Sequence, residues 1–199
     1  MIVACDQNGI NLAATTIKNG GLVVFPTDTV YGLGCDPRNA KAVEMIFQIK
    51  KRKESKQLPI LAYSKDEVSK IAVFDDISSK IADRLWPGQV TLVLKLKDNE
   101  IKKAMKLNDK IAVRVPNNSC ILALLKKCKL VVGTSANFSG QPPFTDSKKV
   151  QEQFSEFDVL LDGGVISNST SSTIVEVKDG ALEILRQGKI TKEEINNSL

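Results

Sequence analysis

Polar side chains gather in three loops at the ends of apolar, strand-like segments. The first loop follows LVVF at 22–25 and has the sequence PTDTVYGLG, with two threonines, an aspartate and a tyrosine. A loop that only reversed the chain would not need so many hydrogen-bonding groups. The other two loops are GTSANFSGQPPFT at 133–145, which begins with three hydroxyls and an amide between glycines, and GGVISNSTSST at 163–173. We therefore expect the three loops to hold a ligand.

A basic segment, KKRKESK at 50–56, lies between the first two loops. Lysine and arginine supply charge to a polyphosphate, and arginine can bind it through two parallel hydrogen bonds. Hydroxyls, amides and backbone N–H groups near glycine and proline supply neutral donors. The combination indicates a nucleotide site, although neither GxxxxGK[ST] nor GxGxxG is present. Taken alone, the basic segment is also typical of a solvated helix end.

The 199-residue chain contains no histidine. This excludes Ser-His-Asp and Cys-His catalysis and histidine-ligated metal sites. Ser135 lies in GTSAN rather than GxSxG, and no histidine could activate it. Proton transfer must therefore use a carboxylate, a lysine, a tyrosine, water or the substrate.

The bulk composition predicts one domain, residues 1–199, with a substantial core, because 42% of the residues are hydrophobic. The net charge of +5 favours polyanionic ligands such as nucleotides or RNA, although a lysine-rich surface also promotes solubility. The four cysteines show no CxxC spacing, and we expect them to be free thiols in a reducing cytosol. No apolar run approaches about 18 residues, so we expect a cytoplasmic protein without membrane contact.

Helical periodicity and strand-like runs alternate along the chain. We expect helices at 7–18, 40–50 (capped by Asn39), 65–72, 77–86, 120–127 (capped by Ser119) and 191–197. We expect strands at 22–25, 58–63, 90–96, 111–116, 130–133 and 158–162, and a hairpin that turns at Asp179-Gly180. This order predicts an α/β fold with a mixed β-sheet and flanking helices.

Seven segments resemble, in order and spacing, the YrdC/TsaC-like L-threonylcarbamoyladenylate synthases. They are FPTDTVYGLG, KKRKESKQLPIL, WPGQVTLVLK, IAVRVP, GTSANFSG, DGG…SST and ILRQGKI, and they extend from about residue 10 to residue 190. The resemblance implies the short, single-domain YrdC-like form, with an open twisted sheet and a concave basic cavity. It also implies the reaction of L-threonine, bicarbonate and ATP to L-threonylcarbamoyl-AMP and pyrophosphate, the first step in forming threonylcarbamoyladenosine in tRNA.

The resemblance also implies cofactors and partners. Mg²⁺ would arrive with ATP, and the protein alone would supply no metal site. Other tRNA-modification proteins would transfer the threonylcarbamoyl group, and direct contact with tRNA is left open. Phosphoryl-type transfer of this kind needs positioning and charge neutralisation more than a protein base, in agreement with the missing histidine.

Site residues follow from the same resemblance. Lys50 and Arg52 would supply the catalytic charge at the phosphates. The threonine site would comprise Thr29, Tyr31, Arg114, Ser135 and Ser172. The nucleotide site would comprise Lys50, Arg52, Lys110, Ser135, Asn137, Thr145 and Arg186.

Alternatives stay open at several positions. Arg114 could instead form an internal salt bridge, and Thr27 and Asp28 could serve only to shape their loop. Gln89 stands where a second proline is common in the family, and the segment after Arg52 is longer than the compact KxRP form. For the whole chain, the alternatives are an RNA-binding module of the same fold without catalysis and a carbamoyl-transferring relative.

Overall fold

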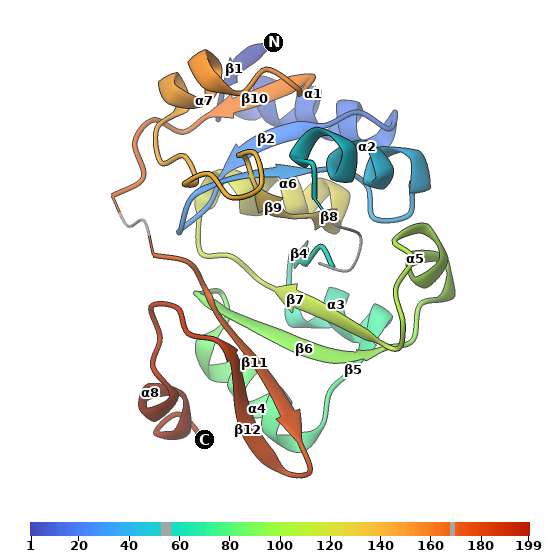
Figure 1. Ribbon diagram of the computed structural model, residues 1–199, viewed down its shortest axis with the longest axis vertical. Helices are drawn as coiled ribbons and strands as arrows, with labels where there is room; N and C mark the ends of the chain where they lie inside the picture. The colour runs from blue at the N-terminus through green and yellow to red at the C-terminus, as the bar shows by residue number, and fades with distance from the viewer. Residues whose placement is uncertain (53–56, 168–169) are drawn as a thin grey trace.

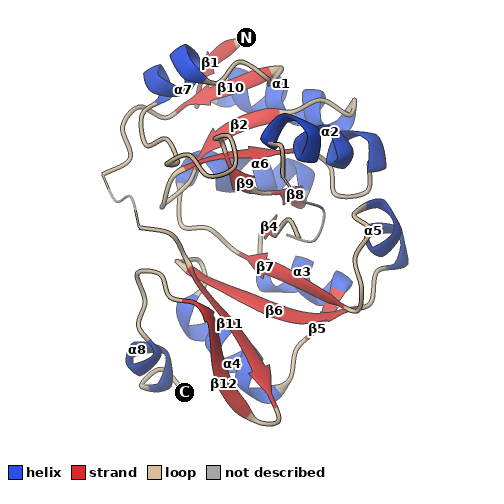
Figure 2. Cartoon of the chain, in the orientation of Figure 1, coloured by secondary structure: helices blue, strands red, loops and turns tan. Residues whose placement is uncertain are grey.

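The computed structural model describes residues 1–52, 57–167 and 170–199 (Figure 1). The lengthened basic segment at 53–56 and residues 168–169 of the third polar loop lie outside the described residues. The described strands form two open mixed sheets, one in each half of the molecule, with helices around both (Figure 2). The α/β fold class is therefore confirmed, and the strands are divided between two sheets rather than joined in one.

The sheet in the N-terminal half has five strands in the order β1-β10-β2-β3-β9. β1, β10 and β2 are parallel, whereas β3 is antiparallel to both β2 and β9. Helices α1 and α6 pack against each other and against this sheet. The strand bounds are β1 Ile2–Ala4, β2 Val23–Pro26, β3 Tyr31–Gly34, β9 Thr134–Ser135 and β10 Val159–Asp162.

The second sheet has seven strands in the order β12-β11-β6-β7-β4-β8, with β5 paired to β6. The pairs β11–β6 and β4–β7 are parallel, and the other pairs are antiparallel. Their bounds are β4 Ile60–Ala62, β5 Ala72–Val73, β6 Val90–Leu96, β7 Lys110–Arg114, β8 Leu130–Val132, β11 Thr173–Lys178 and β12 Ala181–Arg186.

Side-chain caps define where the helices begin. Asp6 accepts a hydrogen bond from the Gly9 amide at 2.8 Å and opens α1. Asn118, and not the expected Ser119, caps α6, because its Oδ1 accepts from the Cys120 and Ile121 amides. The helix bounds are α1 Gln7–Lys18, α2 Ala40–Lys50, α3 Lys65–Ile71, α4 Asp76–Leu85, α5 Asn99–Ala104, α6 Ser119–Cys128, α7 Ser147–Gln153 and α8 Lys192–Asn196.

The first polar loop is shorter than expected, because its second half is the strand β3. β2 and β3 form a hairpin, so that only residues 27–30 form its connection. Glycine is required in β3 by close neighbours: a Cβ at Gly34 would lie 2.0 Å from the Val132 carbonyl oxygen, and one at Gly32 would lie 2.6 Å from the Phe25 ring. The glycines therefore let the sheet pack tightly behind the loop. α5 and α7 were also missed, as were the short strands β1, β5 and β9.

The C-terminal hairpin matches its prediction. β11 and β12 pair on either side of Asp179 and Gly180, whose φ angles are 52° and 75°. Two positive φ angles fit a type I′ turn, which the Asp-Gly pair favours. β11 also pairs with β6, so the hairpin brings residues from the end of the chain beside the middle strands.

One large hydrophobic cluster joins the two halves. It contains Val24 and Leu33 of the five-stranded sheet together with Leu92, Ile111 and Val175 of the other. A second cluster lies between α1, α6 and the five-stranded sheet. In the described parts of the chain, no helix is both long and apolar enough to span a bilayer.

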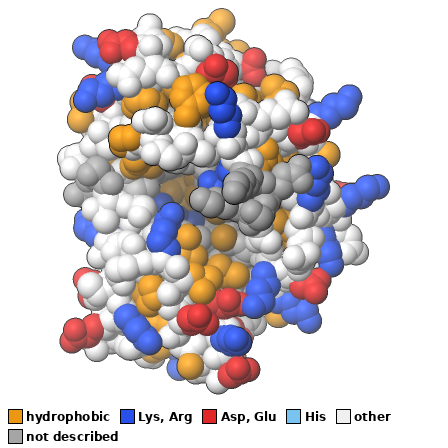
Figure 3. Space-filling view, in the orientation of Figure 1, with side chains coloured by type: hydrophobic (Ala, Val, Ile, Leu, Met, Phe, Trp, Pro, Cys, Tyr) orange, Lys and Arg blue, Asp and Glu red, His pale blue; other side chains and the backbone are white. Residues whose placement is uncertain are grey.

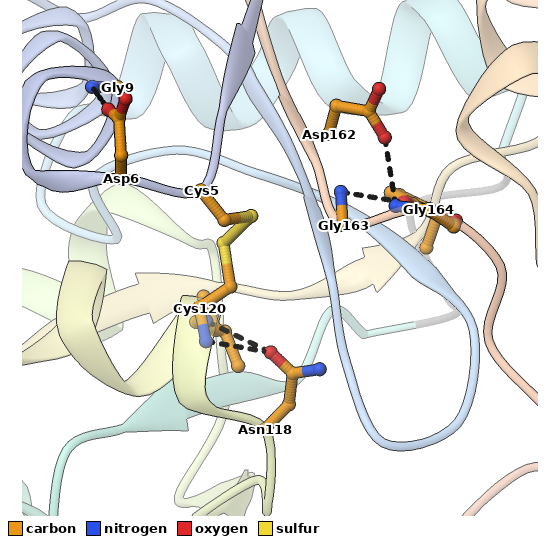
Figure 4. The surroundings of a disulfide bond; sticks show 10 residues. Cys5, Asp6, Gly9, Asn118, Cys120, Asp162, Gly163 and Gly164 are labelled. Carbon is orange, nitrogen blue, oxygen red and sulfur yellow. Dashed lines mark hydrogen bonds between the residues drawn. A yellow bond between two sulfur atoms is a disulfide. The ribbon is translucent and has the colours of Figure 1, made fainter.

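The expectation of four free cysteines is wrong for one pair. Cys5 and Cys120 form a disulfide, while Cys35 and Cys128 are free. Figure 4 shows that the bond joins the segment just before α1 to the first turn of α6, since Cys5 precedes the Asp6 cap of α1 and Cys120 follows the Asn118 cap of α6. The pairing was not predictable from spacing, because 115 residues separate the two cysteines.

Candidate active site

A cavity of about 420 Å³ lies between the two sheets, and we call it the central cavity. The space-filling view shows a hollow across the middle of the molecule, with lysine and arginine side chains near it (Figure 3). Residues from β3, β4, β6, β7, β9, β11 and β12 contribute to its wall. The described lining comprises Thr27, Thr29, Val30, Gly32, Arg52, Gln57, Pro59, Leu61, Thr91, Ala112, Arg114, Gly133, Thr134, Ser135, Asn137, Gln141, Pro143, Ser171, Ser172, Ile174 and Arg186.

The charge of the central cavity is one-sided. Arg52, Arg114 and Arg186 line it, and its described lining contains no carboxylate. Burial lowers the pKa of all three guanidinium groups, and the field of Arg186 lowers the pKa of Arg52 and Arg114 further. The three positive charges repel one another, which costs free energy. An anionic ligand that neutralises this charge would therefore bind favourably.

Arg114 is fixed by the first polar loop and by the turn after α4. Its Nε donates to the Gly88 carbonyl at 2.7 Å, and its Nη2 pairs with Asp28 Oδ1 at 2.5 Å. Its Nη1 lies 3.3 Å from Thr29 Oγ1, which also forms a 2.9 Å hydrogen bond with Thr27 Oγ1. The internal salt bridge considered for Arg114 is therefore present, and the same side chain also lines the central cavity.

Asp28 and Gln89 connect the first polar loop to Arg114 and to the turn after α4. The Gln89 amide donates to the Asp28 backbone carbonyl at 2.7 Å, so the residue at the family's common proline position ties the first polar loop to the turn after α4. Asp28 Oδ2 and Gln89 Oε1 are buried and have no hydrogen-bond partner among the residues that the structure describes. Sequence reasoning left the role of Asp28 open because 86 residues separate it from Arg114.

Ser172 and Arg186 form the wall supplied by the C-terminal hairpin. Arg186 donates to the Ser172 carbonyl at 2.8 Å and to its hydroxyl at 3.2 Å. The Ser172 hydroxyl also forms a 2.9 Å hydrogen bond with Thr91 of β6. Both residues line the central cavity, and the ligands expected for them stay predictions.

Lys50 does not line the central cavity, although Arg52, Ser135 and Asn137 do. Its side chain is 1% exposed, and its ammonium donates to the backbone carbonyls of Ser135 and Asn137 and to Asn137 Oδ1. Burial, together with the field of Arg52, lowers the pKa of Lys50 to about 8. All three of its donors are therefore used inside the protein, and its role as a direct phosphate ligand stays a prediction.

Three other expected site residues also lie off the described cavity wall. Tyr31 is fully buried, and its hydroxyl donates to the Gly164 carbonyl and accepts from the Gly163 amide. Lys110 is exposed and paired with Glu176, at the opposite end of β7 from Arg114 and about 13 Å away along the strand. Thr145 binds Ile166 through its backbone, two residues beyond the lining residue Pro143. Tyr31 thus supports the 163–164 turn, and Lys110 and Thr145 are outside the described lining of this cavity.

A second, larger cavity of about 670 Å³ lies on the other side of the first polar loop, and we call it the outer cavity. Thr27 lines both cavities, and Asp28 lines the outer one. Its described lining comprises Thr27, Asp28, Arg84, Leu85, Pro87, Gly88, Gln89, Val90, Asn117, Asn118, Gly163, Val165, Ile166, Ser167, Lys189 and Ile190. Arg84 and Lys189 are exposed at its surface, so the described lining of this cavity has no cation as buried as Arg114.

The comparisons with known proteins agree with the fold. The Sua5/YciO/YrdC family model, described as telomere recombination, matches residues 15–188. A Methanocaldococcus jannaschii protein is 33% identical over 90% of this chain and 85% of its own length. A Pyrococcus abyssi protein named threonylcarbamoyl-AMP synthase is 33% identical over 94% of this chain, which spans only 56% of that relative.

A solved structure gives the same result. The structure of Pyrococcus abyssi Sua5 complexed with L-threonine has a TM-score of 0.92 and 31% identity, and it covers 100% of this chain and 61% of that one. The agreement therefore extends over both sheets and the loops between them. The chain belongs to the Sua5/YciO/YrdC family.

Proposed function

We propose that the chain is an L-threonylcarbamoyladenylate synthase, which converts L-threonine, bicarbonate and ATP into L-threonylcarbamoyl-AMP and pyrophosphate. The observation that carries the proposal is the charge of the central cavity, with its three arginines, neutral donors and no carboxylate in the described lining. A triphosphate and an amino-acid carboxylate are the anions that such a cavity fits. The names of the P. abyssi relatives support the same activity.

The three arginines differ in burial, and the difference suggests how they divide the anions. Arg114 is 5% exposed, fixed by Gly88 and Asp28, and directed at Thr29, which suits a single small carboxylate. Arg52 and Arg186 are less buried than Arg114, and the charge of Arg186 lowers the pKa of Arg52. Two cations that repel each other suit a ligand with several phosphate charges. The hydroxyls of Ser135 and Ser172 then supply neutral donors at the two walls.

In the proposed reaction, the threonine nitrogen bonds to the carbon of CO₂, which is in equilibrium with bicarbonate. One oxygen of the resulting carbamate attacks the α-phosphorus of ATP, the bond from that phosphorus to the bridging oxygen breaks, and pyrophosphate leaves. The described cavity wall contains no carboxylate, lysine or histidine, so we assign the released amine proton to water or to a substrate phosphate. The protein contributes position and charge neutralisation.

Mg²⁺ enters this proposal only as part of the MgATP substrate. The described residues contain no cluster of three acidic or cysteine side chains that could hold a metal ion. The nearest carboxylate to Arg114, Asp28, is already used in its ion pair. The residues present therefore do not form a protein metal cage, and we derive no step from one.

The product would be passed on, because a mixed anhydride of this kind hydrolyses readily. We propose that tRNA-modification proteins receive the threonylcarbamoyl group and transfer it to an adenosine of tRNA. Direct contact of this chain with tRNA is part of the same proposal, and filter binding with and without the product tests it.

Pyrophosphate release tests the proposed reaction. We expect release from ATP only when threonine and bicarbonate are both present, with threonylcarbamoyl-AMP as the second product by mass spectrometry. Release without threonine would overturn the proposal.

RNA binding without pyrophosphate release would favour the non-catalytic module, and preference for carbamoyl phosphate would favour the carbamoyl-transferring alternative.

A further inference from the structure

The end of α2 is attached to the loop at 135–141 by a buried lysine. The Lys50 ammonium donates to Asn137 O at 2.7 Å, to Asn137 Oδ1 at 3.0 Å and to the Ser135 carbonyl. The Lys50 backbone carbonyl also accepts from the Ser139 amide at 3.1 Å. One residue therefore holds both sides of a loop that is 85–87 residues distant in sequence.

The same contacts determine how Ser135 and Asn137 are presented. Asn137 Oδ1 accepts from Lys50 and from the Ser135 hydroxyl at 2.5 Å, and its Nδ2 donates to the Gln141 carbonyl. The amide orientation is fixed by this pattern, because Oδ1 receives two donors and Nδ2 meets an acceptor. Ser135, Asn137 and Gln141 all line the central cavity, whereas Lys50 lies behind them.

We infer that Lys50 is a positioning residue of the nucleotide site: its charged ammonium holds the loop at 135–141 in the shape that a polyphosphate ligand requires. The inference rests on the proposed function for the identity of the ligand, and it gives Lys50 a role that differs from direct phosphate binding. A neutral amine has one hydrogen fewer to donate, so it cannot serve all three acceptors. The shape of the loop is thereby linked to the protonation of Lys50.

The surroundings of Lys50 determine the pH range in which its protonation changes. The facing loop, SANFSGQ, contributes no charged side chain, and Arg52 on the Lys50 side adds a repulsive field. Burial and Arg52 place the pKa of Lys50 at about 8. A polyanion in the central cavity would offset the field of Arg52 and favour the charged ammonium.

Calorimetric titration with ATP at pH 8, in two buffers of different ionisation enthalpy, measures the linked protons. We expect an uptake of up to about half a proton per ATP by Lys50, since about half of the lysine is neutral at this pH. In Lys50→Met this uptake should disappear, and ATP affinity at pH 7 should fall at least tenfold. Lys51→Met is the matched control, because it removes the adjacent exposed charge, and it should retain both properties.

Amide hydrogen exchange of the ligand-free protein separates positioning from direct binding. Positioning predicts faster exchange at 135–141 in Lys50→Met, while a direct phosphate ligand would leave the empty loop unchanged. If Lys50→Met does not fold, Lys50→Gln is the second variant, because it keeps a donor without the charge: protection at 135–141 should fall in it, while protection in β2 should not.

Two outcomes would overturn the inference. One is equal proton uptake by wild type and Lys50→Met, and the other is protection at 135–141 that does not depend on the side chain at position 50. Failure of the wild type to bind ATP at all would instead count against the proposed function. The exchange experiment would still test the role of Lys50, because it uses the ligand-free protein.

Discussion

The central and outer cavities share Thr27 as a wall residue but differ in how they hold charge. In the central cavity, Arg114 is 5% exposed and fixed by three partners. In the outer cavity, which is larger at about 670 Å³ against 420 Å³, Arg84 and Lys189 are exposed. Water screens exposed charges, whereas buried ones act strongly on a ligand. The comparison favours the central cavity as the candidate ligand site because its Arg114 charge is buried, although its volume is smaller.

The largest effect should follow from removing Arg114, the most buried cation of the described central-cavity wall. Arg114→Met leaves Asp28 buried without its partner, and we expect the free energy of unfolding to fall by about 3–5 kcal/mol. Threonine binding should be lost as well. Denaturant unfolding and calorimetric titration with threonine measure the two effects.

Arg114→Lys is the companion variant, since it keeps the charge near Asp28 but loses the planar fork. We expect a tenfold or greater loss of threonine affinity, about 1.4 kcal/mol, with a smaller loss of stability than in Arg114→Met. Lower stability with unchanged threonine affinity would show that Arg114 serves only the internal ion pair.

The next largest effect should be at the phosphate side of the central cavity. Arg52→Ala removes a half-buried guanidinium from the wall, and the loss of a charge-assisted hydrogen bond costs about 1.5–3 kcal/mol. We expect the KM for ATP to rise accordingly, with a smaller change in the KM for threonine. A rise confined to the KM for threonine would contradict the division between Arg52 and Arg114.

Lys50 should make stability depend on pH in a predictable direction. Its pKa is lowered from 10.5 to about 8, so the unfolded chain binds more protons than the folded one between these values. The free energy of unfolding should therefore rise with pH from about 8 to 10.5, by up to about 1.4 kcal/mol per pH unit. Below pH 8 the lysine is charged in the folded protein, and the full cost of burying that charge is present. Unfolding of Lys50→Met across this range should lack the rise, and an identical profile in both proteins would contradict the assignment.

The smallest effects should come from the outer cavity. Arg84→Ala and Lys189→Ala remove exposed side chains without a buried partner charge, so we expect changes in stability within about 0.5 kcal/mol. Affinity for ATP and threonine should stay within about twofold of the wild type. A tenfold loss of either affinity in these variants would reverse the comparison between the two cavities.

The loop and strand patterns indicated which segments would line a cavity, whereas the individual residues came from the family resemblance. Ser135, Asn137 and Ser172 lie in the polar segments at 133–145 and 163–173, Arg52 lies in the basic segment after α2, and each lines the central cavity. Arg114 alternates with apolar neighbours on β7, which indicated a buried arginine with a specific partner. These are local patterns, and a local pattern can be recognised without knowing the fold.

The pairings between distant segments were not predictable. Lys50 continues the apolar stripe of α2 with Val43 and Ile46, which was a sign of burial, but its acceptors lie 85–87 residues away. Asp28 likewise meets Arg114 across 86 residues. The packing of the two sheets determines which polar groups contact each other. The spacing of residues in the sequence does not show these contacts.

The Cys5–Cys120 bond has a practical consequence for experiments that cut the chain. The covalent ring that it closes contains the first polar loop, Arg52 and Arg114, together with β2 to β7. A single proteolytic cleavage anywhere between the two cysteines leaves both fragments attached. On a non-reducing gel, nicked protein would therefore stay in one species, and only reduction would separate the fragments and reveal the cut.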